Sequence, residues 1–405
     1  MFAAATAGPS SLPESRVTLS GFALLPAQSF ALGTPATGAF DDSGRRRTAP
    51  RFAAQPIQGV SSIKPGSMPG TWWALSDNGF GSRANSSDYR LAIYLFSVTP
   101  AQRSGKRSGS GRVELLARLE LRDPNRVFPW RIAEEVTAAR VLTGADIDPE
   151  SFVILTDGSF WVSDEIGPWL LHFGRGGVLL APPVDLRLAG AAEGAGASAV
   201  AEDRVLRSAS HPLVMAGGAS AQIRNSKGLE GLAFAPGSTS TLLAMLEGPL
   251  PGDVPDELRI LEFDTTRNAW TGRSARYPLD DPKNAIGELA LGASGKLLII
   301  ERDDLQGDSA QFKRVFEVAW TTAATPETSP RLQKRLMANL LDIADPQRLS
   351  TRTGRFRFPF WTIEAIHQPD SRTLVIVNDN NFPASGGRGL STGDPTEWIW
   401  LRLPR

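Results

Sequence analysis

The stretch Leu229-Glu230-Gly231-Leu232-Ala233-Phe234, followed by Leu243-Ala244-Met245-Leu246-Glu247, is the unit from which the fold can be inferred. An apolar strand opens with one glutamate, the turn Ala235-Pro-Gly-Ser238 reverses the chain, and a second apolar strand ends on another glutamate. In an antiparallel hairpin, the start of one strand lies beside the end of the next. We therefore expect Glu230 and Glu247 to lie at the same end of one hairpin.

The same unit recurs along the chain. Three further copies start and end on acidic residues, at Glu150 and Asp164, at Glu288 and Glu301, and at Glu364 and Asp379. A degenerate copy starts near Gly59, lacks the first carboxylate and ends at Asp77. Repeated hairpins of this kind are typical of a β-propeller.

We predict an all-β chain that forms a single closed β-propeller of five four-stranded blades, or six if one repeat is hidden. Residues 16–25 have no hairpin partner nearby and should close the last blade by pairing with residues 398–403. Residues 1–14 are expected to be disordered. The propeller domain is expected to span 15–405, with insertions at about 122–143 and 188–225.

Local features refine this prediction. A short helix is expected around residues 132–140, and residues 169–173 and 178–180 are expected to form the outer strands of the second blade. The Ala- and Gly-rich segment 188–225 interrupts the repeat and is interpreted as a helical insertion or lid, with an extra blade as the alternative.

The overall composition narrows the classes of partner. The 43 basic and 43 acidic side chains balance, which gives no reason to expect nucleic acid or an anionic membrane as a partner. The chain has no cysteine, so disulfides and thiolate metal sites are excluded. No apolar run approaches the roughly 20 residues that span a bilayer, and no signal peptide is visible. We expect a monomer that acts on a small molecule.

The repeated carboxylates predict a metal site. The inner strand of each blade lines the central channel, so the acidic side chains should converge on one of its mouths. At about 4 Å, two like charges repel by about 4 kcal/mol at an effective dielectric constant of about 20. A hard cation such as Ca²⁺, which takes roughly six to eight oxygen ligands, would relieve this repulsion. The predicted ligands are Asp77, Glu150, Asp164, Glu230, Glu247, Glu288, Glu301, Glu364 and Asp379.

Further oxygen donors lie close to these positions in the sequence, at Asn78, Glu165, Asp303, Asp304, Asn378, Asn380 and Asn381. The alternative to a metal site is that each acidic side chain accepts backbone N–H bonds in a neighbouring turn.

Basic side chains in the same motifs predict that the site accepts an anion. The candidates are Lys227, Arg302, Arg83 and Arg388, which could bind a phosphate ester or only neutralise neighbouring carboxylates. Glu230, Glu301 and Asp379 are the candidate catalytic carboxylates. Neither an H-E-x-x-H motif nor a G-x-S-x-G nucleophile elbow occurs, and His172 and His367 lie in strand patterns that indicate packing.

Several of these motifs resemble a known family. The stretches Asp148-Pro-Glu150-Ser, Gly228-Leu-Glu-Gly231, Ile300-Glu-Arg-Asp303 and Val377-Asn-Asp-Asn-Asn381 are similar to the phytase-like family named for an esterase-like activity of phytase. The resemblance covers most of residues 59–403. It implies a β-propeller, exported to the periplasm or the cell exterior, that hydrolyses phosphate or other esters. The lack of a visible export signal departs from that pattern.

Three functions follow as hypotheses. The first is a metal-assisted hydrolase of phosphate esters with its site at the acidic mouth of the channel. The second is a non-catalytic propeller that is stabilised by calcium and binds a ligand or partner. The third is a propeller hydrolase of the lactonase type.

Overall fold

The computed structural model describes residues 17–104, 107–108, 111–188, 205–323, 329–350, 353–384 and 386–404. The predictions for residues 1–14 and for the segment 189–204 lie outside these ranges. Within the described chain, no helix is long and apolar enough to cross a membrane.

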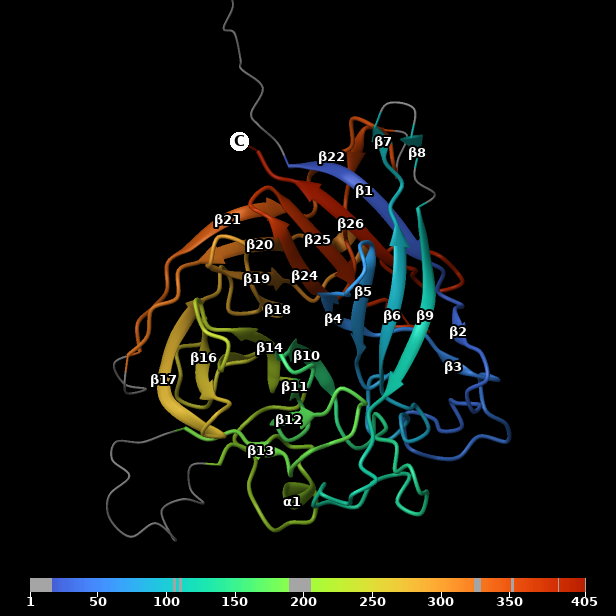
Figure 1. Cartoon of the computed structure of the whole chain (residues 1–405), viewed down its shortest axis with the longest axis vertical. Coiled ribbons are helices and arrows are strands. Elements are labelled where there is room, and N and C mark those ends of the chain that lie inside the picture. The colour runs from blue at the N-terminus through green and yellow to red at the C-terminus, as the bar shows by residue number, and fades with distance from the viewer. Residues whose placement is uncertain are drawn as a thin grey trace, which may run out of the picture.

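The regular structure of the described chain is almost entirely antiparallel sheet (Figure 1). Three of them have four strands in chain order. The first contains β10 (Pro149–Ile154), β11 (Phe160–Asp164), β12 (Trp169–Phe173) and β13 (Val184–Asp185). The second contains β14 (Leu229–Phe234), β15 (Thr241–Leu246), β16 (Glu257–Asp264) and β17 (Ala269–Pro278). The third contains β18 (Ala285–Leu291), β19 (Leu297–Arg302), β20 (Lys313–Val318) and β21 (Lys334–Asn339).

The remaining large sheet has ten strands and joins the two ends of the chain. One half contains β4 (Val60–Pro65), β5 (Thr71–Ser76), β6 (Ala92–Thr99) and β9 (Arg112–Glu120). The other contains β24 (Ile363–Asp370), β25 (Thr373–Asn378), β26 (Thr396–Arg402) and β1 (Thr18–Leu25). One parallel pair, Leu24 with Arg112, connects the halves. Strands β22 (Ile343–Ala344) and β23 (Arg355–Phe356) extend this sheet from β1.

Smaller elements complete the fold. They are β2 (Phe30–Ala31), β3 (Gln55–Pro56), β7 (Arg103–Ser104), β8 (Arg107–Ser108), helix α1 (Pro212–Met215) and the 3₁₀ turn η2 (Gly307–Ser309).

The predicted pairing of the terminal strands is confirmed. Strand β1 runs antiparallel to β26, from the pair Thr18–Arg402 to the pair Leu25–Thr396. Its side chains alternate between buried and more exposed positions, as expected for a strand with one face on the core.

The inner strands β4, β10, β14, β18 and β24 surround the centre of the molecule (Figure 1), and each contacts the next so that the series closes on itself. Four hydrophobic clusters fill the spaces between neighbouring sheets, and a fifth lies between the two halves of the ten-stranded sheet. In one of these spaces Trp161 of β11 meets Phe263 of β16 with ring centroids 5.2 Å apart. The sheets therefore pack face to face around a common axis, which brings the starts of the inner strands together.

One local prediction is wrong and a second is only partly right. Residues 132–140 form turns rather than a helix, because Asp123 accepts hydrogen bonds from the Val127 N–H and the Arg140 guanidinium and holds the segment as a loop. The prediction for residues 178–180 is confirmed in part. Leu179 pairs with Phe173 at the end of β12, but the regular fourth strand beside β12 is β13, and Val178 also pairs with Arg122.

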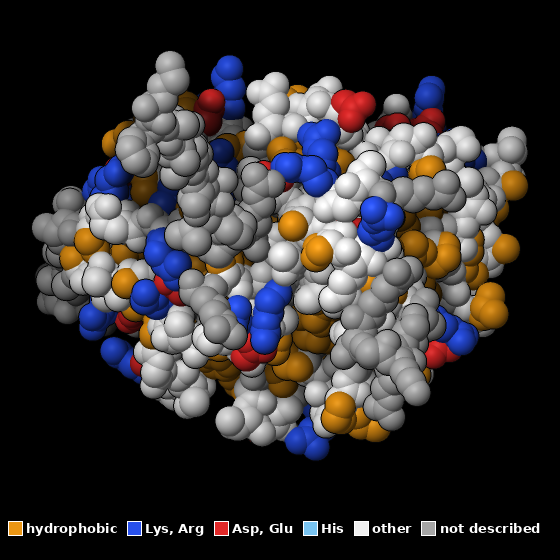
Figure 2. Space-filling view, turned by 90° about the horizontal axis from the view of Figure 1, so that it is seen from above, with side chains coloured by type: hydrophobic (Ala, Val, Ile, Leu, Met, Phe, Trp, Pro, Cys, Tyr) orange, Lys and Arg blue, Asp and Glu red, His pale blue; other side chains and the backbone are white. Residues whose placement is uncertain are grey.

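Figure 2 shows one side of the molecule, on which Lys and Arg side chains are scattered among uncharged ones with a few acidic groups between them. This distribution fits the neutral net charge, and no extended surface of one sign is visible on this face.

Candidate functional site

A one-residue irregularity near the start of each inner strand shapes the centre of the molecule. The pairing with the second strand skips one residue in every case. A β-bulge of this kind leaves its extra residue out of the ladder and redirects its side chain. The bulge residues are Ser61 in β4, Glu150 in β10, Glu230 in β14, Gly287 in β18 and Glu364 in β24.

The second strand of each sheet also supplies a side chain to this central region. It comes from the residue that follows the strand's last pair with the inner strand. The backbone N–H of Asp77 donates to the carbonyl of Gly59 at 2.8 Å. Glu165 and Glu247 make the equivalent bonds to the residues opposite them, each at 3.0 Å. When the sheets are aligned by their strand pairing, the equivalent residues are Asp379, directly after β25, and Arg302, at the end of β19.

Apart from Ser61 and Gly287, these two sets of residues line a pocket of about 630 Å³. Asp77, which is partly buried, lines it together with the buried carboxylates Asp148, Glu150, Glu165, Glu230, Glu247, Glu364 and Asp379. The cations Lys227 and Arg302 also line it. Aromatic and apolar side chains, including the 40% exposed Trp361 and the buried Phe382, form part of its wall.

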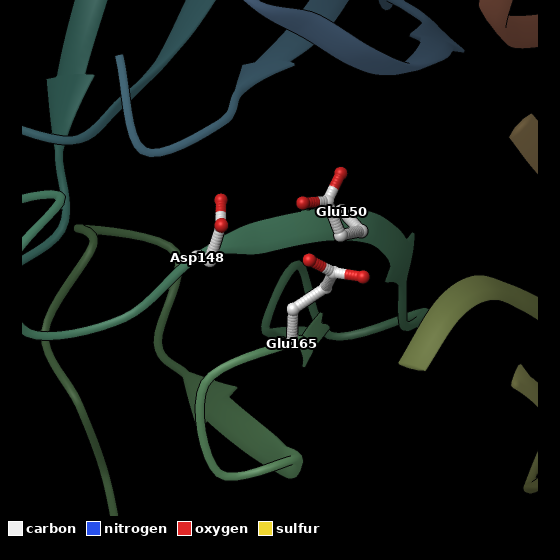
Figure 3. Close-up of side chains that lie close together, drawn as sticks. All are labelled: Asp148, Glu150 and Glu165. Atoms are coloured by element: carbon white, nitrogen blue, oxygen red, sulfur yellow. The ribbon is translucent and has the colours of Figure 1, made fainter. Parts of the chain in front are cut away.

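The carboxylates come close enough together to share a cation. Three triads each offer ligand atoms within 4.8 Å of one another: Asp148–Glu150–Glu165, Glu150–Glu230–Glu364 and Glu165–Glu230–Glu247. Figure 3 shows the first triad, in which the carboxylates of Glu150 and Glu165 approach each other from β10 and from the segment after β11.

Asp148 is oriented by its neighbours. Its carboxylate accepts hydrogen bonds from the backbone and side-chain nitrogens of Asn78, at 3.0 and 2.5 Å. Its own backbone N–H donates to Asp164 at 2.7 Å.

The sheet that contains β18 to β21 supplies a positive charge, Arg302, at the position where the other sheets supply carboxylates. Arg302 donates to Glu247 at 3.1 Å, lies 3.9 Å from Glu364 and pairs with Asp304. Burial opposes its charged form, but Glu247 and Glu364 outweigh burial and raise the pKa of Arg302 above its usual value. Lys227 bonds the other oxygen of Glu247 at 2.7 Å.

Burial and mutual repulsion disfavour ionisation of the carboxylates. Burial is the largest cause of the raised pKa of Glu150, Glu165, Glu230 and Glu364, and repulsion by neighbouring carboxylates adds to it. The pKa of Asp379 rises to about 6, also mainly through burial. A bound cation would offset both effects.

One oxygen atom points to a ligand more directly. Glu165 is 7% exposed, and its Oε1 has no hydrogen-bond partner within the described chain. A buried polar atom without a partner costs about 1–3 kcal/mol. The same residue belongs to two of the three triads, so a cation placed there would satisfy it.

Three predicted ligands lie outside the pocket. Asp164 accepts the backbone N–H of Asp148 and that of Gly167, at 2.7 and 2.6 Å, so it supports the loop that carries Asp148. Burial raises the pKa of Asp164 to about 7.

Glu301 points away from the pocket. It accepts hydrogen bonds from the Tyr277 hydroxyl and the Asn284 amide, both at 2.8 Å, and from Lys334 at 2.6 Å. Because successive side chains of a strand point to opposite faces, Arg302 rather than Glu301 reaches the pocket.

Glu288 is the residue that follows the bulge position of its strand, so it lies further from the pocket than the bulge residues of the other sheets. It accepts hydrogen bonds from Ser62 at 2.6 Å and from Ser151 at 2.7 Å. The bulge position of β18 is the preceding Gly287, where an added Cβ would lie 2.0 Å from the carbonyl oxygen of Ile363. Backbone proximity thus leaves no room for a glutamate at that position.

Two predicted anion-binding residues lie elsewhere. Arg388 is held by both oxygens of Glu397 and by the Phe360 ring, 4.8 Å away. Arg83 donates to the carbonyl of Ala145 at 2.7 Å and lines a neighbouring pocket of about 440 Å³.

The histidines are packed as expected. His172 stacks on Trp161 with ring centroids 4.5 Å apart, and His367 meets Trp72 edge-on.

Sequence reasoning missed Asp148 as a site carboxylate and missed the aromatic wall. Asp148 lies opposite Glu165, as Gly228 lies opposite Glu247, so alignment by strand register would have found it. Trp361 precedes the inner strand of its repeat, and no spacing rule pointed to it.

These features define a class of protein, an all-β chain whose sheets surround a buried acidic pocket at the starts of their inner strands. The chain belongs to the phytase-like family described as "Esterase-like activity of phytase", whose sequence profile matches residues 55–382. The family inferred from the sequence motifs is therefore confirmed.

Comparison with other proteins adds distant similarities. No curated protein matches the chain. Regucalcin from Agrobacterium tumefaciens, a calcium-binding protein, is 10% identical with a TM-score of 0.37, covering 86% of this chain and 92% of its own. Aldose sugar dehydrogenase from Streptomyces coelicolor, in its PQQ-bound form, is 11% identical with a TM-score of 0.33, covering 97% and 100%. These TM-scores are too low to support a conclusion about this chain.

Proposed function

We propose that the chain is a closed five-bladed β-propeller that hydrolyses phosphate esters at the acidic pocket with the help of a bound divalent cation. The blade count is supported by the cyclic contacts of the five inner strands and by five hydrophobic clusters, of which one lies between the two halves of the ten-stranded sheet. In this interpretation the ten-stranded sheet comprises two adjacent blades connected through Leu24 and Arg112.

The observation that carries the proposal is the set of three overlapping carboxylate triads next to Arg302 and Lys227. Glu150, Glu165 and Glu230 each belong to two triads, so they are the proposed principal ligands. Ligand atoms that are all carboxylate oxygens favour a hard cation, and Ca²⁺ accepts a crowded, flexible set of this kind more readily than Zn²⁺ does.

The chain's own residues would bind the ester on the side of the sheet that contains β18 to β21. Arg302 and Lys227 already contact Glu247. A phosphate bound beside them would replace part of these contacts, because its oxygens would accept hydrogen bonds from the two cations. A cation bound to the triads would polarise a phosphoryl oxygen and make a water molecule more acidic.

Two of the three candidate catalytic residues remain in this proposal. Asp379 is held by the Thr362 hydroxyl at 3.1 Å and the Asn381 N–H at 2.8 Å. Its pKa of about 6 suits a general base near neutral pH. Glu230 is the second candidate, as a metal ligand that contacts the reacting group. Glu301 is omitted because its oxygens face Tyr277, Asn284 and Lys334.

The non-catalytic alternative rests on a specific observation. Glu247 already has both oxygens paired, with Lys227 and with Arg302, so cations of the chain itself compensate part of the acidic charge. A propeller that uses calcium only for rigidity would contain the same contacts. By family membership, we also propose a periplasmic or extracellular location, which cell fractionation tests. We further propose a monomeric state, which light scattering tests.

The decisive experiment is phosphate release from a panel of phosphate monoesters, with Ca²⁺ and with a chelator. Glu230→Gln should abolish most of the activity, because it removes one charged ligand and keeps the shape. Glu114→Gln is the matched control, since Glu114 is 46% exposed on β9. Hydrolysis of lactones without phosphate release would support the lactonase alternative. Calcium binding with neither reaction would support the non-catalytic one.

A further inference from the structure

A second pocket lies at the opposite ends of the inner strands. Its volume is about 360 Å³, and its lining is mostly apolar, with Val153, Ala233 and Ala290 among the residues exposed to it. These residues follow the bulge residues of β10, β14 and β18 by three positions. The inner strands therefore start at the acidic pocket and end at this one, which we call the distal pocket.

A polar layer separates the two pockets. Glu288 accepts hydrogen bonds from Ser62 of β4 and Ser151 of β10, and these hydroxyls lie 3.4 Å apart. All three side chains are fully buried. A ligand in the distal pocket would therefore bind independently of the acidic site.

Lys64 supplies a positive charge to the distal pocket. Its side chain is 18% exposed, and it lines that pocket. The ammonium donates to Ser62 at 3.0 Å, lies 3.8 Å from Glu288 and is 5.2 Å from the Phe152 ring centroid. The Glu288 carboxylate already accepts hydrogen bonds from the two serines, and its distance to the Lys64 ammonium is therefore long for an ion pair. Burial lowers the pKa of Lys64, so an incoming anion would favour its charged form.

His367 supplies a neutral polar group beside that charge. It lies on β24, lines the distal pocket and is partly buried against Trp72. No described residue forms a hydrogen bond with its ring. Burial, with a smaller contribution from Lys64, lowers its pKa to about 4, so the ring is neutral at physiological pH and can donate one N–H.

We propose that the distal pocket is a second binding site, for a small monocarboxylate with an apolar tail. The carboxylate would lie between Lys64 and His367, and the tail would contact the apolar walls. An anionic ligand is favoured because, of the described residues that line this pocket, Lys64 is charged and none is acidic, while Glu288 lies behind the lining in the polar layer. The volume is in the range of small-molecule sites, in which apolar walls and a few polar groups fix a ligand's orientation.

Calorimetric titration with octanoate, 1-octanol and inorganic phosphate tests this proposal. Octanoate should bind at least tenfold more tightly than 1-octanol, because the ion pair and hydrogen bonds require the carboxylate. Phosphate should not bind at this site because it lacks an apolar tail. Lys64→Met should weaken octanoate binding about tenfold or more, and Lys296→Met, at a 47% exposed lysine, should not.

Two further variants keep the test decisive. His367→Phe retains an aromatic ring beside Trp72 and should also weaken octanoate binding if Lys64→Met fails to fold. Glu230→Gln should leave octanoate binding unchanged, since it alters only the acidic pocket. Equal affinities for octanoate and 1-octanol, no octanoate binding, or loss of binding in Glu230→Gln would each overturn the proposal.

Discussion

The Arg302 guanidinium donates a hydrogen bond to the carboxylate of Glu247 at 3.1 Å, across the space between the sheets that carry them. The two residues occupy equivalent positions in their second strands, next to the bulge of the inner strand, yet one is a cation and the other an anion. The sheet that contains β18 to β21 also has Gly287 at its bulge. The ring of side chains is therefore asymmetric, because at this one sheet a buried guanidinium replaces the carboxylates and contacts the triad members Glu247 and Glu364.

Arg302→Met should raise KM for a phosphate ester by about tenfold or more, because the substrate loses a charge-assisted hydrogen bond. The structure adds a cost that the sequence does not indicate. Arg302 is 5% exposed, so the variant leaves Glu247 with less compensation, and Tm should fall as well. Steady-state kinetics and thermal melts measure both effects. Arg335→Met, at a 64% exposed position, is the control. An unchanged KM would remove Arg302 from the site.

Removing calcium should destabilise the fold. A cation that binds only the folded protein adds about 2.7 kcal/mol to the free energy of unfolding when present at about 100 times its dissociation constant. A chelator should therefore lower Tm, and added Ca²⁺ should restore it. Glu230→Gln should reduce this response and Glu114→Gln should not. A melting curve that does not respond to chelation, together with no metal in the purified protein, would refute the cation site.

The metal-free protein should become less stable as the pH rises. A carboxyl with a raised pKa in the folded state holds its proton more tightly there, so stability falls with pH between the unfolded and the folded pKa values. For Asp379 this interval runs from 3.8 to about 6, and for Glu230 it starts at 4.5 and extends well above it. In chelator, Tm should be lower at pH 8 than at pH 5.

Calcium should reverse this trend, because it stabilises the ionised carboxylates. The rise in Tm on adding Ca²⁺ should therefore be larger at pH 8 than at pH 5. Equal responses at the two pH values would contradict the assignment of the shifted carboxyls as ligands.

Glu301→Gln should separate a structural carboxylate from the site carboxylates. Its oxygens bond Tyr277, Asn284 and Lys334, so the substitution should lower the free energy of unfolding by about 1–3 kcal/mol. The increase in Tm on adding Ca²⁺ and the KM for a phosphate ester should both equal those of the wild-type protein. Denaturant unfolding and kinetics provide the two readouts. A lost calcium response would place Glu301 back among the ligands.

Much of the architecture follows from sequence alone. The repeated pair of apolar strands identifies the hairpins, and the unpartnered terminal strands predict the pairing of β1 with β26. The glutamates Glu150, Glu230 and Glu364 are at equivalent positions in both the sequence repeat and the pocket. Local patterning suffices here because alternation and turn residues are encoded within each hairpin.

Only the tertiary structure decided which neighbouring residue reaches the pocket. Glu288, Glu301 and Asp164 each lie next to the residue that holds the relevant position: Gly287, Arg302 and Glu165. A one-residue shift moves a strand side chain to the opposite face, and a bulge introduces such a shift without a reliable signal in the sequence. The position of each bulge is set by the ladder with the neighbouring strand and by backbone contacts such as that of Gly287 with Ile363. These contacts exist only once the sheets have packed around the centre, so the charge pattern of the pocket is determined by the assembled fold.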